Sequence, residues 1–348
     1  MGEVSVVTPS PRDVWQQLMR SDPEALPYQS PQWMDGLCAS GAFQDASRLY
    51  VMPDGRRFLL PLARRAARPA WMATAASLPS SWGMGGVLGD TAPSTEDLRI
   101  ICDDIGALPY LQTRLRPNPR QGHLWESAAG RSIGRVKRVS HVLSLEGGFD
   151  HVWSKVFSGP ARSAVRKAER VGVVVEQDRT GRLLPVFHQL LELSFDRWAE
   201  KQHEPRLLSR LRGNARDPLE KFRLIAKHMA EACSVWVAWV DKAPAAAILV
   251  FQNSNANYSR GAMNPELVGT TRANNLLQKL AIEEACRAGC RYYHMGETGS
   301  SKSLAQFKAS FGAVPVHYHE YTFERLPLSR IDRALRRAVK GAIGFKDA

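Results

Sequence analysis

The chain has 348 residues, of which 44% are hydrophobic and nine are tryptophan. This length exceeds that of a typical single domain, so we expect two domains of roughly 150 residues each. No run of about eighteen apolar residues occurs, and the N-terminus lacks the basic-then-apolar order of a signal peptide. The sequence therefore predicts neither a membrane-spanning helix nor secretion, and a cytoplasmic location is expected.

The formal charge of +13 is unevenly distributed along the chain. Residues 1–145 carry 16 basic and 13 acidic side chains, a net charge of +3, which leaves 31 against 21, or +10, for residues 146–348. An excess of this sign predicts an anionic partner for the second half, and nucleic acid, a phosphorylated small molecule and coenzyme A all fit it. A solvated surface rich in arginine is the other interpretation.

The five cysteines are scattered, and only Cys286 and Cys290 lie close together. A zinc site would need further ligands at short spacing, and none is near these two. The sequence therefore predicts reduced, mostly buried thiols and no metal site.

The first half combines helical and strand patterns. A helix is expected over 11–20, with Ser10 as its cap and Pro11 in its first turn, and a second helix over 94–106. A loop rich in small residues occupies 77–90. The expected strands are 46–52, 56–65, 109–115 and 136–144. The pattern is that of an α+β domain.

The second half begins after Gly147-Gly148 and has a regular order of elements. The expected helices are 149–157, 161–170, 181–200, 218–232, 275–289 and 302–312. The expected strands are 173–175, 233–241, 243–253, 255–264, 291–296 and 314–324. Two segments, 203–217 and 265–274, are expected to be irregular.

The helix expected at 161–170 is strongly basic. Arg162, Arg166 and Arg170 recur every four residues and therefore form one stripe, with Lys167 beside it. Like charges on one stripe repel each other unless an anion lies there, so the pattern indicates a phosphate-binding site. A solvated helix face is the other interpretation.

The stretch 291–312 is the most informative. A strand pattern ends at Gly296 and Glu297, and an amphipathic segment follows in which Phe307 and Phe311, four residues apart, share one helix face. If that face is buried, Lys308 lies about 100° away from Phe307 and points toward the rim of a cleft at the strand end. An ammonium group there could stabilise an oxyanion.

These pieces, in this order, resemble the GNAT acyltransferase superfamily, and more closely its FemABX-type branch, which includes BioF2-like acetyltransferases. The matching motifs are the basic helix RxxxRKAxxxGV from Arg162, the Asn-Leu-Leu helix start at Asn275, and FKxxFG from Phe307. The resemblance covers residues 150–324. The first half resembles the degenerate companion domain of Fem-type proteins only through its loop from Pro79 to Gly86.

The resemblance implies an α/β (α+β) fold of two GNAT-like domains. Each would hold a mixed, mostly antiparallel sheet flanked by helices, and the N-terminal one would be degenerate. The implied ranges are 1–147 for the degenerate domain, 148–324 for the acyltransferase domain and 325–348 for a basic C-terminal helix. This last segment carries Arg330, Arg333, Arg336, Arg337 and Lys340. It could lie along a tRNA backbone, remain solvated or lie on a membrane surface.

The Fem-type branch implies a reaction in which aminoacyl-tRNA is the donor and an amide bond is formed with an amine acceptor. No bound cofactor is implied. The QxxGxG motif, which grips the coenzyme A pyrophosphate in ordinary acetyltransferases, is absent, because 265–274 offers only Gly269. A pyrophosphate loop needs glycines so that backbone N–H groups can converge. The polar residues at 270–275 could still bind an anion, or simply cap the next helix.

By this resemblance Lys308 would stabilise the tetrahedral oxyanion and Phe307 would pack against the donor. Glu297 or His294 would accept the proton of the amine, unless the substrate assists its own transfer. A structural hydrogen bond is an equally open interpretation of Glu297 and His294. The candidate binding residues are Arg162, Arg166, Lys167, Arg170, Tyr258, Arg260, Thr271, Arg272 and Asn274.

Two other functions stay open at this stage. One is an acyl-CoA-dependent N-acyltransferase on the same fold, and the other is a non-catalytic protein that binds RNA or another partner. The expected partners are tRNA and a small-molecule amine acceptor. Arg162 and Arg166 suggest an acceptor with a phosphate or carboxylate, such as a nucleotide-linked cell-wall precursor or a peptide-type natural product intermediate. The sequence does not identify the acceptor, the amino acid or the oligomeric state.

Overall fold

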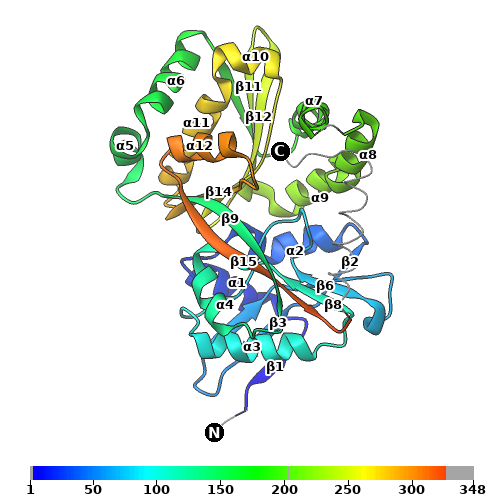
Figure 1. The fold of residues 1–348 in the computed structure, drawn as a ribbon. Helices are drawn as coiled ribbons and strands as arrows, with labels where there is room; N and C mark the ends of the chain where they lie inside the picture. Colours follow the sequence, from blue (N-terminus) through cyan, green and yellow to red (C-terminus); the bar gives the residue numbers. More distant parts are fainter. Residues whose placement is uncertain (1–2, 203, 327–348) are drawn as a thin grey trace. The chain divides into compact units, whose positions relative to one another are not determined.

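The computed structural model describes residues 3–202 and 204–326. The chain divides into two compact units. Unit 1 combines the residues up to Ser140 with a stretch that begins at Val316, and unit 2 contains His141–Pro315. The boundary falls inside two long strands, β9 (Gly134–Ser144) and β15 (Val314–Glu324), so that each strand belongs to both units (Figure 1).

Unit 1 is built from short strands and helices. Its helices are α1 (Arg12–Ser21), α2 (Pro31–Cys38), α3 (Thr95–Ala107) and α4 (Gly122–Ala128). Its strands are β1 (Ser5–Val7), β2 (Phe43–Asp45), β3 (Arg48–Val51), β4 (Arg57–Leu60), β5 (Ala63–Arg65), β6 (Thr74–Ser77), β7 (Leu88–Gly89) and β8 (Gln112–Leu115). One sheet has the order β1-β3-β4-β7, and in the other β15, β8, β6, β5 and β2 are successive neighbours.

The core of unit 1 explains where β15 belongs. Tyr321 and Phe323 of β15 pack in the same cluster as Leu98 and Ile101 of α3, and Tyr321–Glu324 pair antiparallel with β8. The sequence-based division kept all of 314–324 with the second domain. The structure instead counts the strand from Val316 onward with unit 1, because its buried aromatic side chains fill the core of that unit.

Unit 2 follows the order expected from the sequence. Its helices are α5 (Gly148–His151), which continues as one π-turn (Val152–Val156), α6 (Gly159–Arg170), α7 (Leu184–Gln202), α8 (Arg206–Arg216), α9 (Leu219–Met229), α10 (Pro265–Thr271), α11 (Ala273–Arg287) and α12 (Lys302–Ser310). Its strands are β10 (Val174–Asp178), β11 (Cys233–Val240), β12 (Ala243–Gln252), β13 (Ala256–Met263) and β14 (Tyr292–Glu297). They lie in the order β10-β11-β12-β13-β14.

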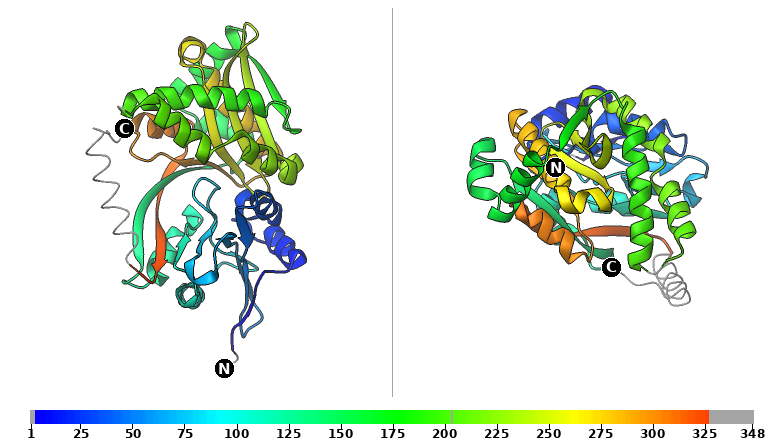
Figure 2. Two further views of the ribbon diagram at one scale, coloured as in Figure 1. Left: turned by 90° about the vertical axis from the view of Figure 1, so that its right-hand side faces the viewer. Right: turned by 90° about the horizontal axis from the view of Figure 1, so that it is seen from above.

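The sheet of unit 2 is covered on both faces. The pairs from β10 to β13 are antiparallel, and β13 and β14 are parallel. Helices α6 and α11 lie on one face, and α7 with its neighbours α8 and α9 lies on the other (Figures 1 and 2). Strand β12 is accordingly an almost unbroken apolar run, in which Ala245–Phe251 are all buried, as expected for a strand without a solvent face.

Two segments expected to be irregular are helices, which corrects the sequence-based assignment. In α8 the buried residues are Ser209 and Gly213, whereas Leu207 is 70% exposed, so the usual pattern of large apolar residues facing inward is missing. In α10, Asn264 caps the first turn and accepts a hydrogen bond from the Glu266 amide, and Pro265 occupies the first helical position. These capping signals at the start of α10 outweigh the low helix propensity of its other residues.

The predicted fold class is confirmed: the chain is a mixed α/β protein whose sheets are mostly antiparallel and flanked by helices. The five cysteines are free thiols, as expected. The basic helix expected at the C-terminus falls at 327–348, outside the described residues. Among the helices of 3–202 and 204–326, none has both the length and the apolar character needed to cross a membrane.

Candidate active site

The sheet of unit 2 opens between its two parallel strands. Within the described residues, β13 and β14 pair only at Ala256 with Tyr293 and at Asn257 with His294, although β13 continues to pair with β12 as far as Met263. A register shift in the β12–β13 pairing falls between Tyr258 and Arg260, so β13 carries a bulge there. A bulge bends its strand, and this one lies where the β13–β14 pairing ends.

Tyr258 lies at this opening and is half-buried. Its side chain folds along its own strand, since a Cβ atom added at Gly261 would lie 1.9 Å from the Tyr258 hydroxyl oxygen. Burial raises the pKa of Tyr258 to about 12, so the phenol stays protonated at neutral pH. A neutral hydroxyl of this kind can donate to, or accept from, a ligand in the opening.

Lys308 contacts the end of β14. Its Nζ atom donates to the backbone carbonyl oxygens of Gly296 and Glu297, each at 2.8 Å. Only 2% of the residue is exposed. The expected position at the rim of an open cleft is therefore wrong. Gly296 and Glu297 are the last two residues of β14, Gly296 has φ +75°, and the ammonium group lies inside against their carbonyl oxygens.

Burial without a hydrogen-bonded acid changes the acidity of Lys308. Desolvation lowers the pKa of its ammonium group to about 7, and the negative charge of Glu297 opposes this shift. Near neutral pH the group is thus divided between a cation and a neutral amine. Both forms can donate to the two carbonyl groups, and the cation retains a third N–H.

The stability of the protein should depend on pH because of Lys308. The folded pKa of about 7 lies below the ordinary value of 10.5, so between these two values the unfolded chain binds more protons than the folded one. The free energy of unfolding should therefore rise with pH across this window, by at most about 1.4 kcal/mol per pH unit from this group. Lys308→Met should remove that contribution.

Urea unfolding of the two proteins at several pH values between neutral and about pH 10 measures this difference. Lys221, whose pKa burial lowers to about 8, contributes equally to both proteins and cancels. Parallel curves for wild type and Lys308→Met would show that Lys308 keeps its ordinary pKa in the folded state.

The aromatic residues around Lys308 anchor α12. Phe311 is fully buried, and its ring lies 5.1 Å from those of both Phe157 and Phe307, edge to face in each case. Gly312 has φ +84°, and a Cβ atom there would lie 2.1 Å from a methyl group of Val156. The FG pair of the FKxxFG motif is thus a packing requirement. Phe307 is half-buried against the same core.

His294 and Glu297 both belong to β14. His294 is fully buried, with its ring 6.5 Å from that of Tyr292. Glu297 is the last residue of the strand and half-buried, and its carboxylate is near enough to Lys308 to act on it electrostatically. The structure thus brings Glu297 and Lys308 together at one strand end, with His294 inside the sheet.

The basic stripe on α6 divides into two parts. Arg162 is occupied by the protein itself: its Nη1 donates to the carbonyl oxygens of Trp153, Ser154 and Phe157, at 3.2, 3.1 and 2.5 Å. Arg166 and Arg170 are exposed and Lys167 is half-buried, and none of the three forms an ion pair with an acid in the described part of the chain. These three side chains are therefore more available to bind an anion than Arg162 is.

The binding residues expected between β13 and α11 have mixed roles. The Thr271 hydroxyl donates to the Leu267 carbonyl within α10 at 2.6 Å, and the Asn274 amide contacts the Met263 sulfur at 2.9 Å. Arg272 is exposed and adopts a left-handed conformation (φ +60°) at the junction of α10 and α11. Only Arg272 presents its side chain to solvent for a ligand.

Arg260 belongs to a buried ion cluster that the sequence did not reveal. Asp217 is fully buried; its carboxylate accepts from Lys221 Nζ at 2.8 Å, from Arg216 Nε at 2.8 Å and from Arg260 at 3.3 and 3.4 Å. These cations hold the pKa of Asp217 well below its ordinary value, against the effect of burial. The cluster fixes the α8–α9 junction to β13. Only the Asp217–Lys221 spacing could have suggested part of it.

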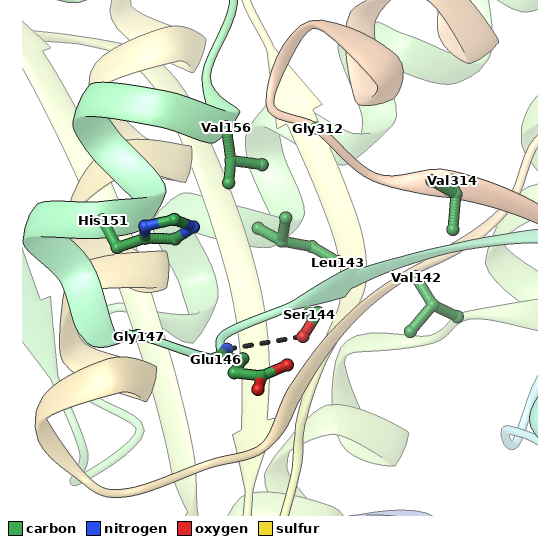
Figure 3. A pocket seen from close by; sticks show the side chains of 9 residues that line it. All are labelled: Val142, Leu143, Ser144, Glu146, Gly147, His151, Val156, Gly312 and Val314. Carbon is green, nitrogen blue, oxygen red and sulfur yellow. Dashed lines mark hydrogen bonds between the residues drawn. The ribbon is translucent and has the colours of Figure 1, made fainter.

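A pocket of about 480 Å³ lies beside the chain segment that leaves α12 (Figure 3). It is lined by Val142, Leu143, Ser144, Glu146, Gly147, His151, Val156, Gly312 and Val314. Its walls are mostly apolar, and Glu146 and His151 supply its titratable groups. None of the predicted site residues lines it. Within 3–202 and 204–326, no group of His, Cys, Asp or Glu side chains could hold a metal ion.

Comparisons with known proteins agree with this arrangement. Residues 159–308 match the model of the acetyltransferase (GNAT) domain family. Among solved structures, the chain is similar to FemX, with a TM-score of 0.66 and 13% identity over 94% of this chain and 99% of that one. A search of curated proteins found no match.

Two further solved structures share the fold at lower similarity. One is a conserved protein of unknown function from Bacteroides thetaiotaomicron, with a TM-score of 0.53 and 10% identity over 91% of this chain and 99% of that one. The other is the C-terminal domain of a putative lysylphosphatidylglycerol synthetase from Agrobacterium fabrum, with a TM-score of 0.50 and 12% identity over 94% of this chain and 95% of that one. At such identities the likeness concerns the fold alone.

Proposed function

We propose that the protein transfers an aminoacyl group from aminoacyl-tRNA to an amine. Two findings support this proposal: residues 159–308 match the acetyltransferase (GNAT) domain family, and the chain has the fold of FemX. The amine nitrogen attacks the ester carbonyl, an amide bond forms, the ester bond to the ribose breaks, and the proton of the amine is transferred to the departing ribose oxygen. The name of the putative lysylphosphatidylglycerol synthetase structure is consistent with aminoacyl transfer.

The observation that carries this choice of donor is the connection between β13 and α11. Coenzyme A binding calls for converging backbone N–H groups in a glycine-containing loop. Here the connection is helix α10, which ends at Thr271 with Arg272 as its C-cap, and the Asn275 amide already donates to the Arg272 carbonyl. The β13–α11 connection is therefore a poor binding site for the pyrophosphate of coenzyme A.

The charge of the chain also favours a large polyanion. Residues 146–348 carry a net charge of +10, so this part of the chain has many cationic side chains that could contact phosphates. Phosphate contacts of this kind supply most of the affinity of proteins for nucleic acids. A net charge of +10 is larger than the binding of one anionic cofactor requires.

We assign the chemistry to the end of β14. The carbonyl groups of Gly296 and Glu297 take two N–H groups of the Lys308 ammonium, and the third would donate to the oxyanion as the tetrahedral intermediate forms. Phe307 would pack against the donor end. Glu297, which lies beside Lys308, or the buried His294 would take the proton of the attacking amine.

The acceptor in this proposal is a small-molecule amine with a phosphate or carboxylate group. Arg166, Lys167 and Arg170 would hold that group, whereas Arg162, whose guanidinium is engaged by backbone carbonyls, would support the helix. A nucleotide-linked cell-wall precursor and a peptide-type natural product intermediate both have this chemistry.

The second candidate is acyl-CoA-dependent N-acyl transfer. It is favoured by the opening between β13 and β14, because unpaired strand edges can bind an extended ligand that carries amide groups, and the pantetheine arm of coenzyme A is such a ligand. The two candidates differ in donor and share the site.

One experiment separates the two donors. The protein is incubated with charged tRNA, or with acetyl-CoA, each in the presence of a panel of amines, and product is measured with and without prior RNase treatment of the donor. We expect product from charged tRNA only, and its loss after RNase. Product from acetyl-CoA alone would overturn the proposal and select the second candidate.

A further inference from the structure

A cluster of arginines in unit 1 stands without acidic partners. Between Asp54 and Asp90 the chain contains five arginines and no acid. Arg56 and Arg57, near the start of this stretch, pair with Asp97 and Asp90. The other three, Arg64, Arg65 and Arg68, form no ion pair with any acid of the described residues. The low net charge of the first half hides this local excess.

The three arginines lie at one end of the β5–β6 connection. Arg64 belongs to the paired part of the sheet, opposite Gln44 of β2 and Ala75 of β6. Arg65 and Arg68 are exposed, and Arg64 is partly so. The guanidinium carbon of Arg65 lies 4.5 Å from the centroid of the Phe43 ring. Stacking on this buried ring limits the freedom of the guanidinium and leaves its N–H groups for a ligand.

A large aromatic side chain stands exposed in the same connection. Trp71 is 66% exposed and its neighbour Met72 38%, and Trp71 makes no ring contact within the described residues. The backbone beneath it is held, because the Met72 amide donates to Pro69 and the Leu111 amide to Ala73. The described residues of unit 1 therefore leave this indole uncovered on an ordered turn.

We propose that this tip, defined as Arg64, Arg65, Arg68, Trp71 and Met72, binds an unpaired segment of RNA. The arginines would contact successive backbone phosphates, and a base would stack on Trp71. This combination of cationic groups along a backbone and an aromatic platform is the way single-stranded nucleic acids are bound without sequence preference. The inference rests on the proposed function, since it names where the RNA of the donor contacts the protein.

RNA fits the tip better than a lipid bilayer does. An interfacial anchor presents a broad apolar face with several large side chains, whereas this tip offers one indole and one methionine. Arginine also binds phosphate with a planar, two-pronged set of donors, which suits the phosphates of a nucleic-acid strand.

The test measures RNA binding apart from catalysis. Wild type, the triple variant Arg64→Gln/Arg65→Gln/Arg68→Gln and Trp71→Ala are titrated against fluorescent uncharged tRNA and a short unstructured RNA, over a series of salt concentrations. The matched control, Arg20→Gln/Arg131→Gln/Lys137→Gln, removes the same charge from three exposed positions of unit 1. Thermal unfolding confirms that each variant is folded.

The triple variant should bind RNA about tenfold or more weakly and lose about two units of the slope of log affinity against log salt, because three phosphate contacts disappear. Trp71→Ala should weaken binding to the unstructured RNA about tenfold, and the control should stay within about twofold of wild type. Equal losses in the control and the triple variant, or unchanged binding in both tip variants, would overturn the assignment.

Three further outcomes separate this inference from the proposed function. In the first, the tip variants bind RNA as well as wild type does but lose the binding of wild type to vesicles of anionic phospholipid. This result would assign the tip to membranes and overturn the RNA proposal. Wild type that transfers from charged tRNA while the tip variants bind RNA normally would refute the tip alone. Wild type that transfers only from acetyl-CoA would refute the donor and, with it, this inference.

Discussion

Replacing Lys308 with methionine is expected to lower the rate of acyl transfer about 10²–10³-fold, the usual cost of removing one donor to an oxyanion. Methionine has a similar length and no charge, so it fits the buried position. It cannot donate to the carbonyl groups of Gly296 and Glu297, which Lys308 contacts at 2.8 Å. Single-turnover transfer from charged tRNA, at saturating amine, measures the chemical step.

The control for this prediction is Lys302→Met. Lys302 lies on the same helix, α12, but is exposed, and we expect it to retain the wild-type rate. Thermal unfolding of both variants separates a loss of the catalytic group from a loss of structure. A folded Lys308→Met protein with the rate of wild type would remove Lys308 from the mechanism and leave it as a residue that holds the end of β14.

The resemblance that located the acyltransferase domain came from the order of its elements. The strands and helices that were predicted between residues 173 and 324 are present in the structure, with small shifts at their ends. The FKxxFG motif was informative because its residues are physically constrained: Phe311 is fully buried, and Gly312 has no room for a Cβ atom beside Val156. Packing of this kind leaves a pattern in the sequence that a reader can find.

Helix α8 shows why other elements were missed. Periodicity reveals a helix when large apolar residues face inward. In α8 the buried face consists of small residues, and Gly213 packs directly on the Phe195 ring, where a Cβ atom would lie 2.6 Å from a ring carbon. Leu207 and Leu211 face solvent instead. Without the position of α7, the sequence gives no reason to expect this.

The sequence allowed us to select the residues of the candidate site but did not allow us to predict which groups they contact. Lys308 and Arg162 were selected as cations for an anionic ligand, yet in the structure both donate to backbone carbonyl groups. A backbone carbonyl at a strand end or in a π-turn that accepts from a distant side chain has no signature in the amino-acid sequence. Such partners become visible only when the chain path is known, and they decide whether a cation is available to a ligand.

The Asp217 cluster illustrates the same limit over a longer distance. Asp217 and Arg260 are far apart in sequence and belong to different kinds of element, the α8–α9 junction and β13. No pattern in the chain connects them. The sequence-based analysis placed Arg260 among the ligand-binding residues, whereas the structure shows its guanidinium 3.3 Å from a buried carboxylate. Arg260 is therefore first of all a structural residue.

Replacing Asp217 with asparagine should destabilise the protein by about 3–5 kcal/mol, the usual result of removing one partner from a buried ion pair. Asparagine keeps the shape of the side chain but leaves the charges of Lys221, Arg216 and Arg260 without their common carboxylate. Lys221 is affected most, since it is 6% exposed and cannot gain solvation. Urea unfolding at neutral pH measures the change in the free energy of unfolding.

The matched control is Asp196→Asn, which breaks the ion pair of Asp196 with Arg210, a residue whose side chain is 55% exposed. A pair open to solvent contributes at most about 1 kcal/mol. A second substitution tests the physical cause: adding Lys221→Met to Asp217→Asn removes the buried cation that lost its partner, so the double variant should be more stable than Asp217→Asn alone. If Lys221→Met instead adds a further loss of its own, the destabilisation comes from lost packing, and the buried charge is not its source.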